Sequence, residues 1–453
     1  MSATQVQVTH YPYRKCKFSE SVDLKINGKT LVTPTFAPRL KSDGDMKVYN
    51  SVMRHYKPKQ ISAFVVRLLD TGRTLYQSMK KTTLSNLVVD QQTLDNQFTP
   101  SSHEKVLLID PALEYLYYSV NMERLATTPF VSHTIRDYLT KFMKKTKEMD
   151  EAKLHGDMED TIGKNLMRES EHTNFWTCVY KDPNMRMKLI RDTFNVELKA
   201  KADVLIPPVP LITSSHLLDV AIFMNEKSRA FSPALSQEKR ECADYFVLKP
   251  SILKNDHMMS ALKEYISTSE SSLTLFKFKN LNLCDESMAL ERAAFKSFLM
   301  ELSLVSQQFE NKAFGLLESG NQTFAAACSS FAIVSTGFNL DREDRRRNQS
   351  DIPPFANRYD RINMTMQDKA TFMKTVENNN DIIPCDCKIC TENAIIPEHD
   401  FIEYNRRAKE HYLLCREAEM NEIIDAIQNQ ESQIAFEKLQ RSSLKNLIDI
   451  IPR

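Results

Sequence analysis

Three cysteines lie within six residues of one another in the sequence PCDCKIC, as Cys385, Cys387 and Cys390. Thiolates this close together can converge on one ion only around a tight turn, which Pro384 and the intervening polar residues permit. Zn2+ prefers four tetrahedral ligands, most often Cys and His. The spacing therefore predicts a zinc site whose fourth ligand comes from further along the chain.

His411 is the fourth ligand that we favour. Residues 400–430 have a helical pattern in which His411 shares one stripe with Leu414 and Cys415, so its side chain is expected on the inward face. His399 and Cys415 are the alternative ligands. Four protein ligands leave no open position, so the ion would be structural, one per chain, and would hold the C-terminal helix to the rest of the fold.

Asp110 ends the apolar run KVLLID, where a carboxylate commonly caps the following turn.

A basic loop follows the last apolar run and is a candidate nucleic-acid site, since arginine forks match phosphate oxygens. An ion-pair cluster with Asp341, Glu343 and Asp344 is the alternative interpretation of this loop. Its arginines are Arg342, Arg345, Arg346 and Arg347.

Composition narrows the class of protein. The 453 residues include 60 Lys and Arg against 59 Asp and Glu, a formal net charge of +1, so any nucleic-acid surface must be a local patch. A hydrophobic content of 42% and a charged content of 26% exclude collagen-like and wholly disordered proteins. Only 8 residues are glycine, so glycine-rich phosphate or base loops are largely ruled out.

The sequence also predicts a cytoplasmic protein. No apolar run approaches the roughly 18–20 residues that span a bilayer, and the first residues lack the apolar core of a signal peptide. The nine cysteines are an odd number and mostly scattered, which is not the pattern of a disulfide framework.

Eight short apolar or β-branched runs alternate with longer helical patterns such as 258–267 and 288–309. Eight strand–helix units predict an α/β protein with a (β/α)8 TIM barrel, and an open doubly wound sheet is the alternative. The expected strands are 31–37, 61–66, 105–110, 202–206, 245–248, 273–278, 312–317 and 331–335.

The expected organisation has three parts. Residues 1–340 form the barrel, with a charged helical insertion at about 120–200 because that connection is too long for a plain barrel. Residues 341–384 form a connecting loop region, and residues 385–453 form a zinc-binding helical subdomain.

Taken in order, these motifs resemble the tRNA-guanine transglycosylase superfamily. Thr33, Pro34, Phe36 and Pro38 look like the Thr-Pro-x-Phe-x-Pro of its first strand, and Asp110 falls at the acidic position of its third. KAFGLLESGNQTFAAACSSFAIVS looks like its seventh and eighth strands, and PCDCKIC with the downstream histidine looks like its zinc subdomain. The resemblance covers most of the chain.

The resemblance implies base exchange in nucleic acid. One carboxylate attacks the sugar carbon of a guanosine, guanine leaves, and a 7-deazaguanine base replaces it, while a second carboxylate moves a proton. Asp110 is expected to transfer the proton and Asp341 to be the second carboxylate. DNA is slightly preferred over tRNA as the substrate, because the chain lacks the C-terminal tRNA-binding modules of archaeal relatives.

The sequence departs from the family at several positions. No carboxylate ends the eighth strand at 331–336, where the family has its nucleophile, and Pro207 and Pro208 stand where a base-reading Asp would follow the fourth strand. Asp110 is followed by Pro111 and Ala112 instead of a glycine-rich loop. Either this chain acts on a different substrate from the rest of the family, or it has lost the catalytic activity.

Three interpretations follow from these observations. They are a DNA-acting transglycosylase, a tRNA-acting one, and a non-catalytic transglycosylase-like subunit that binds nucleic acid or a catalytic partner. Family members often dimerise through the zinc region, so a homodimer or a heteromeric partner is expected.

Overall fold

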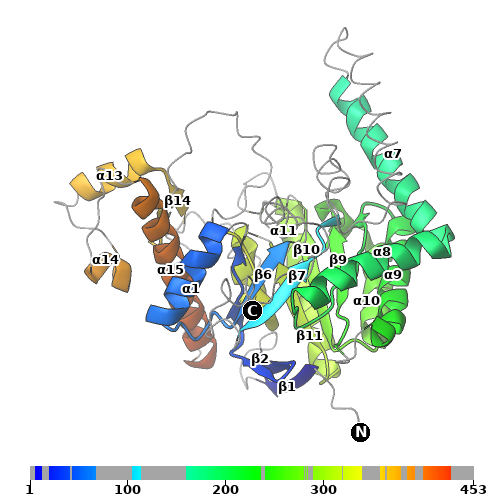
Figure 1. Ribbon diagram of the computed structural model, residues 1–453, viewed down its shortest axis with the longest axis horizontal. Coiled ribbons are helices and arrows are strands. Elements are labelled where there is room, and N and C mark those ends of the chain that lie inside the picture. Colours follow the sequence, from blue (N-terminus) through cyan, green and yellow to red (C-terminus); the bar gives the residue numbers. More distant parts are fainter. Residues whose placement is uncertain are drawn as a thin grey trace, which may run out of the picture. The chain divides into compact units, whose positions relative to one another are not determined.

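The chain is α/β, as a computed structural model shows (Figure 1). It divides into two compact units. Unit 1 comprises Met1–Gln5, Val66–Leu94 and Leu107–Lys279, and unit 2 comprises Val6–Val65, Asp95–Val106 and Asn280–Arg453. The described residues are 6–12, 20–40, 43–67, 105–113, 160–235, 240–279, 281, 283, 289–318, 320–338, 358–362, 365–378, 385–392 and 401–429.

Parallel strands form the centre of unit 1. The strands β8 (Leu211–Ile212), β9 (Asp244–Leu248) and β10 (Leu273–Phe278) are neighbours in that order, and all their residues are buried. Complete burial is typical of parallel strands that are covered on both faces. The register places Phe246 beside Phe276, and their rings stack with centroids 6.0 Å apart.

The helices of unit 1 begin at clear sequence signals. Asp182 caps α8, since its side chain accepts hydrogen bonds from the backbone N–H groups of Asn184 and Met185, and Pro183 occupies the first helical position. Asn255 caps α10 by accepting from Met258 N. The helices are α7 (Asp160–Lys181), α8 (Pro183–Lys199), α9 (Ser215–Leu235), the 3-10 helix η3 (Pro250–Lys254) and α10 (Asp256–Thr268).

Unit 2 contains an antiparallel sheet and three more parallel strands. The chain reverses between β2 and β3 at Asn27 and Gly28, whose φ values of 49° and 80° suit the tight turn of a hairpin. The parallel strands have the order β4-β12-β11. The strands of unit 2 are β1 (Val6–Pro12), β2 (Glu20–Ile26), β3 (Lys29–Leu31), β4 (Thr35–Phe36), β5 (Arg39–Leu40), β11 (Ala313–Leu317), β12 (Phe331–Val334), β13 (Arg358–Asp360) and β14 (Thr365–Gln367).

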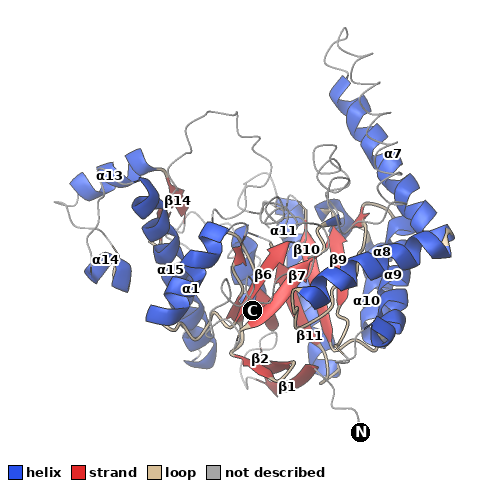
Figure 2. Cartoon of the chain, in the orientation of Figure 1, coloured by secondary structure: helices blue, strands red, loops and turns tan. Residues whose placement is uncertain are grey.

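The helices of unit 2 include the long α15, which packs beside α1 (Figure 2). Glu417 of α15 accepts hydrogen bonds from the backbone N–H groups of Lys59 at 2.7 Å and Gln60 at 2.8 Å. Lys409 of α15 also forms an ion pair with Asp45 of α1. The helices are α1 (Asp43–His55), α11 (Ala289–Gln308), the 3-10 helix η5 (Gly320–Gln322), α12 (Thr323–Ala327), α13 (Lys369–Asn378), α14 (Lys388–Glu392) and α15 (Phe401–Asn429).

The α/β class and most of the expected strands are confirmed. Two further expected strands are β6 (Ala63–Arg67) and β7 (Val106–Asp110), each of which begins in unit 2 and ends in unit 1. The expected strand 202–206 does not form a regular strand: Leu205 makes an isolated parallel bridge with Cys242, and Asp203 N donates to the carbonyl of Leu107. Pro207 and Pro208 follow it and offer no N–H group, so the ladder cannot continue there.

Several elements were not predicted from the sequence. The three-stranded sheet of β1, β2 and β3 precedes the first expected parallel strand. The region 341–384, expected as a connecting loop, contains β13, β14 and α13 in its described part. Within the helical insertion expected at about 120–200, the described residues form α7 and α8.

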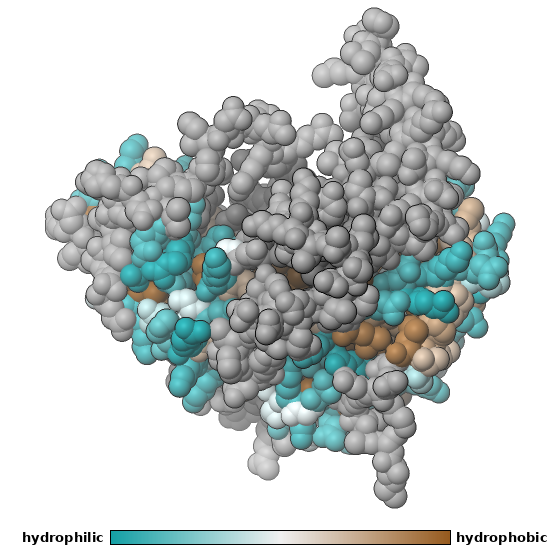
Figure 3. Space-filling model, in the orientation of Figure 1, coloured by the Kyte–Doolittle hydropathy of each residue, from teal (hydrophilic) through white to brown (hydrophobic). Residues whose placement is uncertain are grey.

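The surface is mainly hydrophilic where Figure 3 shows described residues, with a smaller apolar group at the right. The large hydrophobic side chains that are exposed among the described residues are Val32, Tyr180, Leu290 and Ile362. None of the described helices combines the length and the apolar character required to cross a membrane.

Candidate metal centre

The predicted cysteine cluster and His411 come together in unit 2. Cys385 and Cys387 precede α14, which contains Cys390, while His411 and Cys415 lie one turn apart on α15. Hydrogen bonds from the backbone N–H groups of Cys390 and Thr391 to the carbonyl of Cys387 start the first turn of α14. This turn accompanies a separation of 3.3 Å between Sγ of Cys387 and Sγ of Cys390.

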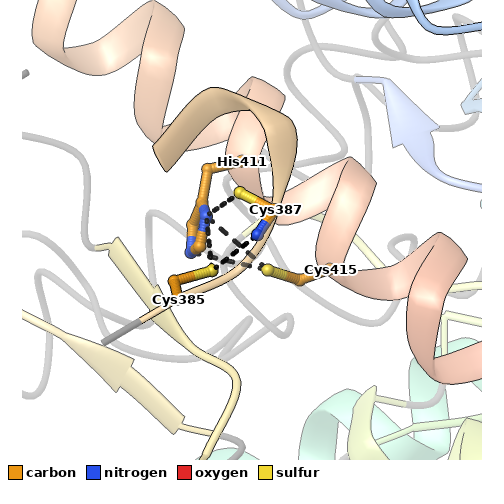
Figure 4. A group of neighbouring side chains, drawn as sticks. All are labelled: Cys385, Cys387, His411 and Cys415. Atoms are coloured by element: carbon orange, nitrogen blue, oxygen red, sulfur yellow. Dashed lines mark hydrogen bonds between the residues drawn. The ribbon is translucent and has the colours of Figure 1, made fainter. Parts of the chain in front are cut away.

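The ligand atoms of four residues lie within 4.8 Å of one another, and these residues are Cys385, Cys387, His411 and Cys415 (Figure 4). The Nδ1 atom of His411 is 3.8 Å from Sγ of Cys385, 3.1 Å from Sγ of Cys387 and 3.6 Å from Sγ of Cys415. The cluster could therefore hold a metal ion.

Cys390 also belongs to this cluster. Its Sγ lies 3.3 Å from Sγ of Cys387 and 3.4 Å from Nδ1 of His411. The guanidinium of Arg358, on β13, donates a hydrogen bond to the same sulfur. The four residues predicted as ligands are thus brought together, and Cys415, predicted as an alternative, lies beside them.

The orientation of His411 is set by a backbone carbonyl. Its ring is almost completely buried, and Nε2 lies 2.6 Å from the carbonyl oxygen of Tyr359. Because a carbonyl can only accept, Nε2 carries a proton, and in the neutral ring Nδ1 presents its lone pair to the sulfurs. Partners of this kind commonly fix the tautomer of a metal-binding histidine.

The pKa values of the thiols in this cluster are shifted in opposite directions. Hydrogen bonds with Cys387 and Cys390 lower the pKa of Cys385, whereas burial raises the pKa of Cys415. Burial and the charge of Arg358 act to lower the pKa of His411, but the adjacent Cys385 and Cys387 outweigh them and raise it. A metal ion would therefore displace protons when it binds.

Asp110, predicted to transfer protons, is fully buried at the end of β7 in unit 1. Its Oδ2 lies 2.6 Å from Nζ of Lys277, on β10, and its Oδ1 accepts from the hydroxyl of Tyr245, on β9, at 2.8 Å. The backbone N–H of Ala112 donates to Oδ1 at 2.9 Å. Both oxygens therefore have partners, and Lys277 neutralises the charge.

A second carboxylate, Glu318, directly follows β11 in unit 2 and is also paired. Its Oε2 lies 2.9 Å from Nη1 of Arg39, and both side chains are completely buried. The end of β12 carries Ser335 and Thr336, both buried. Within the described residues 331–338 there is no carboxylate at the position where the resemblance implies a nucleophile.

The remaining predicted site residues lie outside the described residues. They are Asp341, Arg342, Arg345, Arg346, Arg347 and the alternative ligand His399.

The partners of these site residues were not predicted from the sequence. Lys277 interrupts the apolar run LTLFKF, and a single cation inside a buried strand is a signal that a carboxylate lies nearby. Arg358 and Tyr359 carry no comparable signal, because they stand in a short hairpin far from the cysteines in sequence.

Comparison with known proteins finds no protein-family model and no curated protein that matches the chain. The function must therefore be inferred from the chemistry of these sites.

Proposed function

We propose that this chain is a zinc-stabilised (β/α)8 barrel of the transglycosylase type and acts as the non-catalytic subunit of a base-exchanging assembly. The proposal rests on the surroundings of the Asp110 carboxylate. This group is buried, forms an ion pair with Lys277 and accepts hydrogen bonds from Tyr245 and Ala112. A general base must reach the proton that it takes, and Asp110 has no exposed surface from which to do so.

Contacts between the first and last expected strands support closure of the barrel. In unit 2, β4 pairs in parallel with β12, with Thr35 opposite Ile333, and Phe36 N donates to the carbonyl of Gln60 on its other side. In unit 1, Asp203 N donates to the carbonyl of Leu107, and Leu205 forms a bridge with Cys242. Pairing of the first strand with the last is what a closed barrel requires and an open sheet lacks.

The donor set supports zinc as the metal. Thiolates together with one imidazole are the ligands that structural zinc sites use, and calcium or magnesium would require oxygen. The thiols must be reduced to bind it, which favours a cytoplasmic location. Four protein ligands would close the coordination sphere, so the ion would stabilise the α14–α15 region and take no part in chemistry.

The second carboxylate also argues against catalysis by this chain. Glu318 is the described acidic residue near the ends of β11 and β12, and its pairing with Arg39 commits it to a buried ion pair. Attack on a sugar carbon needs an ionised carboxylate that can contact the substrate. The catalytic carboxylates would then belong to a partner subunit, with nucleic acid bound by the assembly.

Base exchange by the chain itself is the second candidate function. It is favoured by the place of Asp110 at the carboxyl end of β7, since barrels carry their catalytic groups at that end. The reaction would replace guanine with a 7-deazaguanine, in DNA in preference to tRNA. Asp110 would transfer the proton, Asp341 would be the second carboxylate, and the arginines of 342–347 would contact phosphate.

Two experiments separate these functions. The purified chain is incubated with isotope-labelled guanine and either tRNA or duplex DNA, and we expect no incorporation into either nucleic acid. In cells that lack the gene, mass spectrometry of digested DNA and tRNA should show that a deazaguanine nucleoside is lost. Expression of the Asp110→Asn chain should restore that nucleoside, because a non-catalytic subunit does not need the carboxylate.

Incorporation by the purified chain alone, abolished by Asp110→Asn, would instead establish the enzyme. Since Asp110→Asn leaves the ammonium of Lys277 without its anionic partner, the variant Asp110→Asn/Lys277→Met, which removes both charges, is the control for loss of folding.

A further inference from the structure

We propose that Cys390 and Cys415 are alternative fourth ligands of the metal, so that the centre holds one thiol more than the ion can bind. The inference rests on the proposed zinc site and adds to it a specific redundancy. Cys385, Cys387 and His411 are common to both ligand sets, and the fourth position is filled from α14 or from α15.

Five soft donors surround a single centre. A tetrahedral zinc ion accepts four of them, so one must remain unbound whenever the ion is in place. The five are Cys385, Cys387, Cys390, His411 and Cys415.

The distances favour neither Cys390 nor Cys415. A sulfur and an imidazole nitrogen on one tetrahedral zinc lie roughly 3.5 Å apart, given bond lengths of about 2.3 and 2.0 Å. Sγ of Cys390 is 3.4 Å from Nδ1 of His411, and Sγ of Cys415 is 3.6 Å from the same atom. Both sulfurs are therefore at about the sulfur–nitrogen separation of two ligands on one ion, and Cys415 Sγ, which is also 3.6 Å from Nε2, lies beside the ring.

Each thiol also has a favourable state when it is not bound to the ion. Cys390 accepts a hydrogen bond from the Arg358 guanidinium, so its sulfur keeps a partner when it is not bound to the ion. Cys415 is completely buried on the inward face of α15, where a neutral thiol packs as a small apolar group. In the exchange one metal–sulfur bond breaks and another forms, and the proton of the incoming thiol passes to the outgoing thiolate.

Metal content and the spectrum of the Co2+ form test this proposal on the full chain. Each thiolate bound to Co2+ adds to the sulfur-to-metal charge-transfer band, so the band intensity counts sulfur ligands. The variants are Cys390→Ala, Cys415→Ala and the double variant, and Cys178→Ala replaces an exposed cysteine of unit 1 as the matched control. Circular dichroism and thermal unfolding are recorded for every variant.

We expect one metal ion and an unchanged charge-transfer intensity in both single variants, because three thiolates remain available to each. The double variant should fall to two-thirds of the wild-type intensity. Its zinc affinity should weaken by more than about a hundredfold, beyond the range typical of losing an outer-shell partner.

The proposal is overturned if one single variant alone behaves like the double variant, since the other cysteine then never binds the metal. It is likewise overturned if one single variant fails to fold in zinc while the other is normal. A wild-type chain that binds no metal would refute the zinc site itself, and this outcome is distinct because it is measured before any substitution is made.

Discussion

The carbonyl oxygen of Tyr359 lies 2.6 Å from Nε2 of His411, which connects the β13–β14 hairpin to the metal centre on α15. The adjacent Arg358 donates to the sulfur of Cys390, so two consecutive residues of β13 contact two different donors of the site. The hairpin is therefore an outer layer of the candidate metal centre. Loss of one such outer partner typically weakens metal binding about 10–100-fold.

Replacement of His411 by Ala should reduce zinc content and thermal stability together, because His411 belongs to both proposed ligand sets. Each kcal/mol lost should lower Tm by about 2–4 °C for a unit of this size. Elemental analysis and calorimetry measure the two effects. His257→Ala, at an exposed position of α10, is the control. Full zinc occupancy in His411→Ala with an unchanged Co2+ charge-transfer band would mean that the ring is not a ligand, whereas a stronger band would mean that the fourth thiol has replaced it.

Replacement of Lys277 by Met should destabilise the protein by about 3–5 kcal/mol, because it leaves the Asp110 carboxylate buried without a cation. The double variant Asp110→Asn/Lys277→Met should recover most of this loss, since neither charge then remains. Urea unfolding of both single variants and the double variant gives the coupling energy. A double variant as unstable as Lys277→Met would show that the packing of the two side chains, and not their charges, accounts for the lost stability.

Glu197 predicts a pH dependence of stability. Burial raises its pKa well above the usual value, and its Oε1 has no hydrogen-bond partner among the described residues. At a pH below the pKa that Glu197 has in the unfolded chain, the residue is protonated in both states, and its contribution to the free energy of unfolding is fully present. As the pH rises above that value the unfolded state ionises first, and stability falls until the pH passes the folded pKa.

Glu197→Gln should remove this decline and make the protein more stable than wild type at neutral pH. Unfolding free energies measured between pH 4 and 8 give the comparison, in which wild type should lose up to about 1.4 kcal/mol per pH unit relative to the variant. Parallel profiles for the two proteins would contradict the assignment of Glu197 as a neutral acid.

Asp182→Ala should cost about 1 kcal/mol of stability, because the side chain caps the first turn of α8. Asp182→Asn keeps an oxygen acceptor at the same position and should lose only a small part of this. Chemical unfolding of the three proteins is sufficient as a test, and equal losses in both variants would point to charge as the cause.

The sequence predicted the parts of the site that depend on local spacing. The three clustered cysteines are separated by one and two residues, and the inward position of His411 follows from the period of a helix. The parallel strands were equally recognisable because each is short, apolar and bounded by polar residues or proline.

Long-range pairings could not be predicted in the same way. Lys277 is 167 residues from Asp110 and Tyr245 is 135 residues from it, so no local pattern joins them. Glu318 directly follows β11, but its partner Arg39 lies 279 residues away. The ionisation and access of a buried carboxylate depend on such partners, which is why the sequence could not decide between catalysis and its loss.

The hydrogen bonds from Lys59 and Gln60 to Glu417 also set a limit on how the protein is made. The partners are more than 350 residues apart, so this part of unit 2 cannot be completed on the ribosome until α15 has emerged. At roughly 5–20 residues per second, the early segment waits about 20–70 s for its C-terminal partner. During that interval the apolar surfaces of β4 and α1 lack the cover of α15, and we expect nascent chains to need a chaperone until synthesis of α15 is finished.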